Sequence, residues 1–291
     1  MIKGGLKHLS RVSDVLFRKL RVERDITIFP DDVFLTSYPR SGNTWMRFLV
    51  GNLLHQEKPV TFLNMEGLVP DMYKQSDRTL RHMPRPRILK SHECFDPRYR
   101  RIIYIVRDPR DVVVSNYHWE MKKRSMRDAY PIEKFVEGWM EPVYWVRVGS
   151  WGDHVTSWLS TRQGHDGFLL LRYEDLLTDP TRELAKVARI LGVEPVPEKM
   201  ARAVELSSAD RMKKLEKEQG SKWVETRNTR QDKQFVRQAS SGGWRATLPA
   251  ECVARIETEW GPLMKSLGYA LSTEEVSPAP SYVGSTDVEQ H

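Results

Sequence analysis

A short loop near the N-terminus combines residue types that can bind a phosphate group. The segment SYPRSGNTW, residues 37–45, places Arg40 and Gly42 between an apolar run and a helix-like stretch. Such a loop directs backbone N–H groups at an anion, and the helix N-terminus that follows adds a favourable partial charge. Thr44 could cap the helix or donate its hydroxyl to a phosphate. Since no Walker A sequence occurs in the chain, an ordinary tight turn is the alternative interpretation.

A possible general base lies in the segment LKSHE, residues 89–93. The neutral imidazole of His92 can take a proton from a hydroxyl group near pH 7. Lys90 could stabilise negative charge that develops at the same place. Glu93 is a second candidate, but neighbouring residues on a strand face opposite ways, so only one of the two is expected to serve. A single histidine is by itself more often structural than catalytic.

A second cationic site is indicated after the apolar run IIYIV, residues 102–106. Arg107 follows the run directly, and Asp108 and Pro109 suit the N-cap and the first position of a helix. Arg107 is therefore expected near a helix N-terminus, with Ser115 farther along that helix. An Arg–Asp surface pair is the alternative interpretation.

Apolar runs and helical patterns alternate around these residues. Strands are expected at 33–37, 87–90, 102–106 and 168–172, and helices at 44–55, 109–123, 150–162 and 180–191. Runs such as IIYIV and FLLLR, the latter up to its final arginine, are continuously apolar, which is typical of strands with both faces covered. The alternation predicts a single α/β domain: a central, mainly parallel sheet flanked by helices, with a P-loop-kinase-like phosphate-binding turn after its first strand. Ligands of such sheets bind beyond the carboxyl ends of the strands.

Taken together, these segments resemble the motifs of cytosolic-type sulfotransferases that use PAPS (3′-phosphoadenosine 5′-phosphosulfate). SYPRSGNTW resembles the family's TYPKSGTTW loop for the 5′-phosphosulfate, and KSH at 90–92 resembles its KTH motif. Arg107 and Ser115 have the spacing of its 3′-phosphate site. Later segments also match, in the family's order up to about residue 269: GSWGDHV, LRYED, SSADRM and FVRQASSGGWR.

The resemblance implies transfer of a sulfuryl group from PAPS to a hydroxyl or amine, with release of 3′,5′-ADP. His92 would be the general base, and Arg40 and Lys90 would stabilise charge at the transferring group. The implied donor-binding residues are Arg40, Ser41, Gly42, Asn43, Thr44, Trp45, Arg107, Ser115, Tyr173, Ser207, Arg237, Gln238 and Ala239. A transferring sulfuryl group carries less negative charge than a phosphoryl group, so cationic side chains could replace magnesium and no metal is expected.

Several positions depart from the family's pattern. Arg40 stands where the family usually has a catalytic lysine; it keeps the charge but cannot donate a proton near neutral pH, so an electrostatic role is expected. A PAPS-binding protein that lost activity through this change is the alternative. Asn43 replaces a frequent threonine. Gln238 and Ala239 replace lysine and glycine in the last motif, and Ala209 replaces an aromatic residue.

The composition allows other functions. The chain has 291 residues and a formal charge of +7, which favours anionic partners. A P-loop-like kinase and a non-catalytic nucleotide- or nucleic-acid-binding protein are therefore alternatives. The missing Walker lysine disfavours the kinase, and no recognised binding module supports a nucleic-acid partner. Two distant cysteines, the lack of a long apolar run and an N-terminus without a secretory signal together predict a cytoplasmic protein.

The two ends of the chain differ from the domain expected at 25–271. Residues 1–24 are basic with leucines at helical spacing, and this predicts a helix that packs on the domain or makes weak contact with an anionic membrane surface. Residues 272–291 are acidic and are expected to be a disordered tail.

The sequence leaves open whether the acceptor is a small molecule, a carbohydrate or a lipid. It also leaves the oligomeric state open. Residues 60–86, 120–148 and 213–234 are expected to border the acceptor pocket. Four aromatic residues in or near them are pocket walls or core: Tyr73, Trp119, Trp139 and Trp145.

Overall fold

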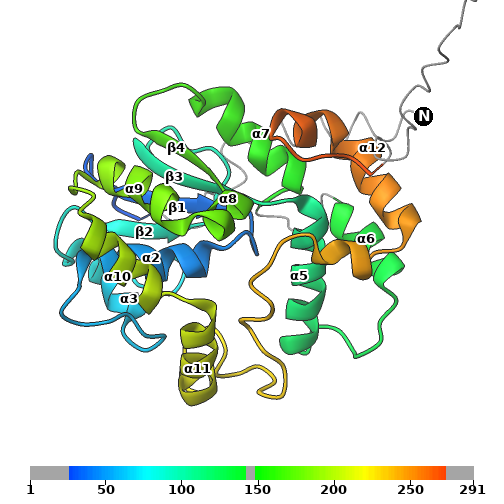
Figure 1. The fold of residues 1–291 in the computed structure, drawn as a ribbon, viewed down its shortest axis with the longest axis horizontal. Coiled ribbons are helices and arrows are strands. Elements are labelled where there is room, and N and C mark those ends of the chain that lie inside the picture. The colour runs from blue at the N-terminus through cyan, green and yellow to red at the C-terminus, as the bar shows by residue number, and fades with distance from the viewer. Residues whose placement is uncertain (1–25, 142–147, 273–291) are drawn as a thin grey trace, which may run out of the picture.

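The computed structural model describes residues 26–141 and 148–272. Four parallel strands form one sheet in the order β2-β1-β3-β4 (Figure 1). The strands are β1 (Val33–Ser37), β2 (Ile88–Ser91), β3 (Arg101–Val106) and β4 (Phe168–Arg172). All of β1 is buried, and β3 is buried after its first residue. The parallel sheet and the buried run IIYIV are thus as the sequence predicted, but β4 lies at an edge of the sheet and only Leu171 of its five residues is fully buried.

Helices surround this sheet, and most of those expected from the sequence begin and end within a residue or two of the prediction. They are α2 (Asn43–Leu54), α3 (Met65–Leu68), α4 (Asp77–Arg81), α5 (Pro109–Lys122), α6 (Ile132–Met140), α7 (Trp151–Arg162), α8 (Tyr173–Thr178), α9 (Pro180–Leu191), α10 (Pro197–Leu206), α11 (Ala209–Gln219) and α12 (Ala250–Ser266), with a short 3₁₀ helix, η1 (Gly243–Ala246).

The side chains of each central strand alternate between two hydrophobic cores. Phe34 of β1 faces a core that includes residues of α5, α7 and α12, whereas Val33 and Leu35 face a core built with α2, α9 and α10. Figure 1 shows these two groups of helices on opposite sides of the molecule. Because both faces of the sheet are covered, its edge at the carboxyl ends of the strands is the place left for a ligand site.

The start of α2 differs from one expectation. The N-cap residue is Gly42 rather than Thr44, and no side chain caps this end. Gly42 has φ near 100°, and a Cβ atom there would lie 2.5 Å from the ring of Tyr173. A residue with a side chain is excluded by both the backbone conformation and the close contact. The hydroxyl of Thr44 is thus left to line the cavity described below.

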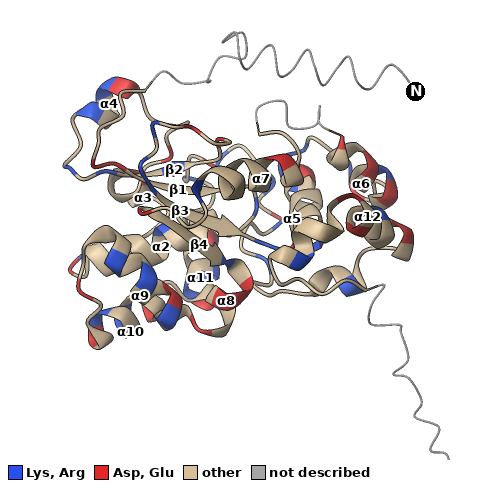
Figure 2. Cartoon of the chain, turned by 90° about the horizontal axis from the view of Figure 1, so that it is seen from above, with Lys and Arg blue, Asp and Glu red and all other residues tan. Residues whose placement is uncertain are grey.

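Basic and acidic residues are interspersed over the described part of the chain rather than gathered on separate faces. Figure 2 shows Lys and Arg interleaved with Asp and Glu along the outer helices, and several acidic residues on α6 and α12. No helix within 26–141 or 148–272 is long and apolar enough to cross a membrane. The basic segment predicted at 1–24 and nearly all of the acidic tail predicted at 272–291 lie outside the described residues, as does Trp145.

Candidate active site

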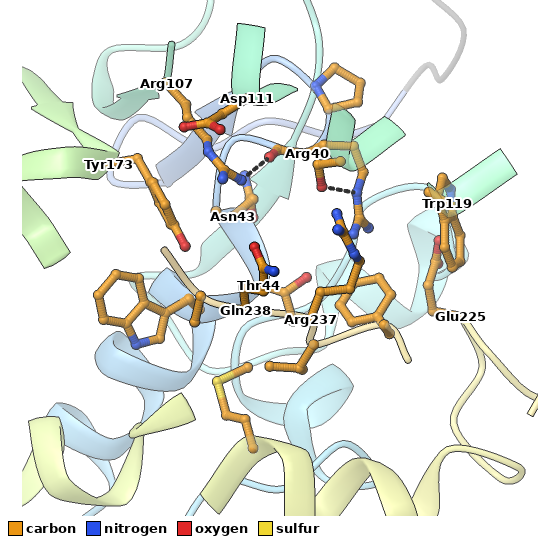
Figure 3. Close-up of a pocket in the computed structure, with 18 of the residues that line it drawn as sticks. Arg40, Asn43, Thr44, Arg107, Asp111, Trp119, Tyr173, Glu225, Arg237 and Gln238 are labelled. Carbon is orange, nitrogen blue, oxygen red and sulfur yellow. Dashed lines mark hydrogen bonds between the residues drawn. The ribbon is translucent and has the colours of Figure 1, made fainter. Parts of the chain in front are cut away.

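A cavity of about 570 Å³ lies at the carboxyl edge of the sheet. It brings together almost every residue that the sequence assigned to the site: Arg40, Gly42, Asn43, Thr44, Trp45, Lys90, His92, Arg107, Ser115, Tyr173, Arg237, Gln238 and Ala239. Figure 3 shows Arg107 and Arg237 pointing into this space from opposite sides, with Arg40 between them and Trp119. Three segments far apart in the sequence thus supply positive charge to one cavity.

The loop between β1 and α2 is tied to the strand that precedes it. The Asn43 amide donates to the Leu35 carbonyl at 3.0 Å and to Ser37 Oγ at 3.3 Å. Arg40, like Gly42, has a left-handed backbone conformation, with φ 71°. These constraints leave the loop curled around the N-terminus of α2, an arrangement suited to an anion.

The second cationic site is built from the start of α5 and the loop 235–243. Arg107 donates to the carbonyl of Arg40 at 3.3 Å and to that of Ser240 at 3.0 Å, and it stacks over the Tyr173 ring at 4.2 Å. Arg237 lines the same region from the loop. Nε of Arg107 is buried and has no hydrogen-bond partner among the described residues.

The sequence did not indicate the residue that holds this loop in place. Asp111, in the first turn of α5, accepts N–H groups from Gly242 at 2.7 Å and Trp244 at 3.1 Å. Burial raises the pKa of this carboxyl group, although Arg107 acts against the rise. Ala239 in the loop has φ 50°, a conformation for which the family's usual glycine is better suited.

His92 is held in one tautomer. Its Nδ1 lies 2.6 Å from the carbonyl oxygen of Ser37. Because a carbonyl can only accept, Nδ1 carries the proton and Nε2 carries the lone pair. Burial, together with Lys90, lowers the pKa of His92 to about 3. The imidazole is therefore neutral at neutral pH, with a lone pair that can accept a proton.

Lys90 is oriented by an acid that the sequence did not indicate. Its Nζ lies 2.5 Å from Oδ2 of Asp71, whose residue is 2% exposed. Burial raises the pKa of Asp71, but Lys90 and then Arg47 outweigh it and bring the pKa to about 2. Asp71 is thus ionised and keeps the ammonium group of Lys90 beside His92. No local pattern marks Asp71, since its partner belongs to another strand segment.

The structure separates His92 from Glu93. Glu93 is not among the residues that line the cavity, and its Oε1 accepts the hydroxyl of Tyr73 at 2.9 Å. The same Tyr73 oxygen accepts the backbone N–H of His92 at 2.9 Å. Of the two residues, only His92 lines the cavity. Tyr73 and Trp119 border the cavity, whereas Trp139 is a buried core residue.

Arg40 rests between aromatic rings. Its guanidinium carbon lies 4.6 Å from the ring centre of Phe235 and 5.2 Å from that of Trp119, and its Nε donates to Ser115 Oγ at 3.3 Å. Burial and Arg107 lower the pKa of Arg40 to about 10, while the Glu225 carboxylate acts in the opposite direction. Arg40 remains charged at neutral pH.

Two predicted donor-binding residues are not among those that line the cavity. Ser41 is fully buried, and its hydroxyl has no partner among the described residues. Ser207 is also buried; its hydroxyl donates to Ala203 and accepts from Asn52, and its carbonyl accepts the Trp45 indole N–H at 3.0 Å. Ser207 thus positions Trp45, one of the donor-binding residues that the resemblance implied.

Within the described ranges, no group of three or more His, Cys, Asp or Glu side chains is arranged to hold a metal ion. The positive charge at the cavity comes instead from Lys and Arg.

The comparisons with known proteins agree with this geometry. The family model described as "Sulfotransferase domain" matches residues 30–268. The chain therefore belongs to the sulfotransferase domain family, as the motifs indicated.

Curated relatives include sulfotransferase 1B1 of Canis lupus familiaris, 29% identical over 74% of this chain and 77% of the relative. Sulfotransferase 1E1 of Rattus norvegicus is also 29% identical, over 81% of this chain and 84% of the relative. Among solved structures, retinol dehydratase with retinol and PAP superposes with a TM-score of 0.69, at 22% identity over 83% of each chain. A mouse sulfotransferase, SULT7A1, complexed with PAP gives a TM-score of 0.65, covering 86% of this chain and 90% of that one. These structures share the fold.

Proposed function

We propose that this protein transfers a sulfuryl group from PAPS to a hydroxyl or amine acceptor and releases 3′,5′-ADP, with His92 as the general base. The observation that carries the proposal is the meeting of three features in one cavity. An anion-binding loop, a separate cationic site and a neutral imidazole with its lone pair on Nε2 line the same space.

The donor fits these features in one orientation. The 5′-phosphosulfate lies against the loop and the N-terminus of α2, where Arg40 and Thr44 line the cavity. The 3′-phosphate lies between Arg107 and Arg237, and the adenine lies near Trp45 and Tyr173. The presence of PAP in the structures of retinol dehydratase and mouse SULT7A1 supports this choice of nucleotide.

The proposed reaction is an in-line transfer. His92 Nε2 takes the proton from the acceptor hydroxyl, and the acceptor oxygen forms a bond to sulfur. The bond between sulfur and the bridging oxygen breaks, and its electron pair leaves on the 5′-phosphate of 3′,5′-ADP. Arg40 and Lys90 stabilise the charge that develops, so positioning and electrostatics supply most of the catalysis.

Donor binding also prepares the base. In the free protein, burial and Lys90 hold the pKa of His92 at about 3. The negative charges of bound PAPS favour the protonated imidazole and raise that pKa. A pKa closer to the working pH makes the imidazole a more effective general base.

The donor assignment is tested by thermal stability with nucleotides and no added metal. A ligand that binds the folded state raises the melting temperature. We expect a larger rise with 3′,5′-ADP than with AMP, because AMP lacks the 3′-phosphate for Arg107, Ser115 and Arg237. Equal shifts from the two nucleotides would count against the assignment.

The general base is tested by His92→Ala, with Glu93→Gln as the comparison. We expect kcat of His92→Ala to fall about 10²–10⁴-fold, the range for loss of a general base, while 3′,5′-ADP still binds. Steady-state kinetics with labelled PAPS provide the measurement. Near-normal turnover in His92→Ala together with an inactive Glu93→Gln enzyme would assign the base to Glu93.

We further propose a cytoplasmic enzyme that acts on a small-molecule acceptor. One relative, of Arabidopsis thaliana, is named cytosolic sulfotransferase 12. Both cysteines of this chain are free thiols, which suits a reducing compartment.

A further inference from the structure

The turn at residues 71–74 lies beside the proposed base and contributes to the cavity. Asp71 accepts the ammonium group of Lys90, and the Tyr73 ring stacks on the His92 imidazole with ring centres 6.4 Å apart. The turn is closed by the Lys74 N–H, which donates to the Asp71 carbonyl at 2.9 Å. The turn that contacts Lys90 and His92 therefore also presents Lys74 to the cavity.

Lys74 is paired across the cavity wall with Glu225. Its Nζ lies 3.3 Å from Oε2 of Glu225, which belongs to the segment after α11. Figure 3 shows Glu225 next to Trp119, on the opposite side of the cavity from Tyr173. Tyr173 belongs to the proposed donor site. The Lys74–Glu225 pair is therefore part of the wall on the acceptor side.

The pair remains in contact with water. The Lys74 side chain is 37% exposed and the Glu225 side chain 25% exposed, whereas Lys90 is only 12% exposed. An apolar acceptor packed against Lys74 and Glu225 would remove this water without returning a hydrogen bond, which is unfavourable. A hydroxyl group can take the place of the water, because it both donates and accepts.

We propose that the Lys74–Glu225 pair selects acceptors that carry at least one hydroxyl besides the one to be sulfated. The substrate class is a polyhydroxylated ring compound, a polyol or a glycoside, rather than a simple phenol or a steroid. The aromatic rings of Tyr73, Trp119 and Phe235 line the same cavity and provide apolar surface for the C–H groups of such a ring. This inference rests on the proposed function.

The test compares acceptors with one hydroxyl and with several, at saturating PAPS. Cyclohexanol and 4-nitrophenol form the first set, and myo-inositol and methyl β-glucoside the second. We expect kcat/KM to be at least about tenfold higher for the second set, the size of one hydrogen bond to a charged group. In Lys74→Met and in Glu225→Gln, the ratio of kcat/KM for the second set to that for the first set should fall toward one. Glu137→Gln is the control, since it breaks a similar exposed ion pair, Arg255–Glu137 at 3.3 Å.

The thermal shift with 3′,5′-ADP, measured for every variant, reports folding and the donor site independently of the acceptor. If this thermal shift is normal, any of three results would overturn the acceptor inference while leaving the proposed function intact. Wild type could prefer the single-hydroxyl acceptors, it could neither bind nor turn over any polyol, or the preference for polyols could survive in both variants. Absence of any shift and of any turnover would overturn the proposed function, and this inference with it.

Discussion

At the residue scale, Arg40 keeps the positive charge of the loop although an arginine replaces the family's usual lysine. The guanidinium is planar and spreads its charge, so it can lie against Phe235 and Trp119 while Nε hydrogen-bonds Ser115. A lysine has no planar group to fill the space between these rings. Burial and Arg107 lower the pKa of Arg40 to about 10, which still leaves Arg40 charged at neutral pH. Arg40 can therefore act on the leaving phosphate by charge alone.

Substitution of Arg40 tests that role. We expect Arg40→Lys to remain active, since the charge is kept. Arg40→Ala should lose about 10²–10³-fold in kcat, the scale for removing one electrostatic stabiliser of a transition state. The Kd for PAPS should change much less than kcat, because charge on the bridging oxygen develops mainly during transfer. Kinetics and donor titration of both variants provide the measurement. Wild-type turnover in Arg40→Ala would transfer the role to Lys90 and leave the loop as a binding element.

At the scale of elements, α5 organises the 3′-phosphate site. Asp108 caps the helix by accepting the N–H of Arg110, which confirms the expected start at Pro109. Arg107 lies just before the helix. Asp111, in its first turn, accepts hydrogen bonds from the backbone N–H groups of Gly242 and Trp244. The first turn of α5 thereby fixes the position of the loop that carries Arg237 relative to Arg107.

Asp111→Asn should therefore weaken binding of the 3′-phosphate. The asparagine carbonyl can keep one of the two N–H bonds, but its NH₂ group cannot accept the other. We expect the affinity for 3′,5′-ADP to fall about tenfold, the effect of one lost hydrogen bond, and that for AMP to fall less. Calorimetric titration of both nucleotides provides the measurement, and AMP serves as the internal control. Equal losses for the two nucleotides would show that Asp111 supports the whole cavity rather than this loop.

At the scale of the whole molecule, a buried histidine connects the sheet to the site. His154 on α7 is fully buried; its Nδ1 lies 2.8 Å from the Tyr104 hydroxyl on β3, and its Nε2 lies 3.2 Å from the His92 carbonyl. Since that carbonyl only accepts, Nε2 carries the proton and Nδ1 accepts from Tyr104. Burial lowers the pKa of His154 to about 4. The imidazole is therefore neutral in the folded protein.

Because His154 is neutral in the folded state, the protein loses stability in mildly acidic solution. Below the ordinary histidine pKa of about 6.5, the unfolded chain binds a proton at this residue and the folded chain does not. The stabilisation is thus complete above about pH 6.5 and is lost as the pH falls toward 4, by about 2 kcal/mol between pH 6.5 and 5. We expect His154→Gln to lose less free energy of unfolding over that interval than wild type, measured by urea denaturation.

His82→Gln is the control, because His82 is exposed on the surface. Its loss of stability between pH 6.5 and 5 should match that of wild type. Parallel curves for wild type and His154→Gln would show that His154 is not the group responsible.

Much of this protein could be predicted from the sequence because the relevant signals are local. The mainly apolar segments at 33–37 and 168–172 are strands with those bounds, since their apolar side chains pack alternately into the cores on the two faces of the sheet. The motifs around Arg40, His92 and Arg107 could likewise be identified, because each is a strand end followed by a turn. Parallel strands bring such ends to one edge, so the cavity itself was predictable in outline.

Only the tertiary structure decided how those residues are held. Asp71 and Lys90, Asp111 and Gly242, and Lys74 and Glu225 are far apart in the chain, and no local pattern pairs them. The N-cap of α2 is Gly42 rather than Thr44, and the Tyr173 ring leaves no room for a side chain there, a contact that depends on where β4 ends. Local sequence determines which segments become strands, helices and turns. The choice of partners depends on how those elements pack, because hydrogen bonds and ion pairs require distances that only the packed chain provides.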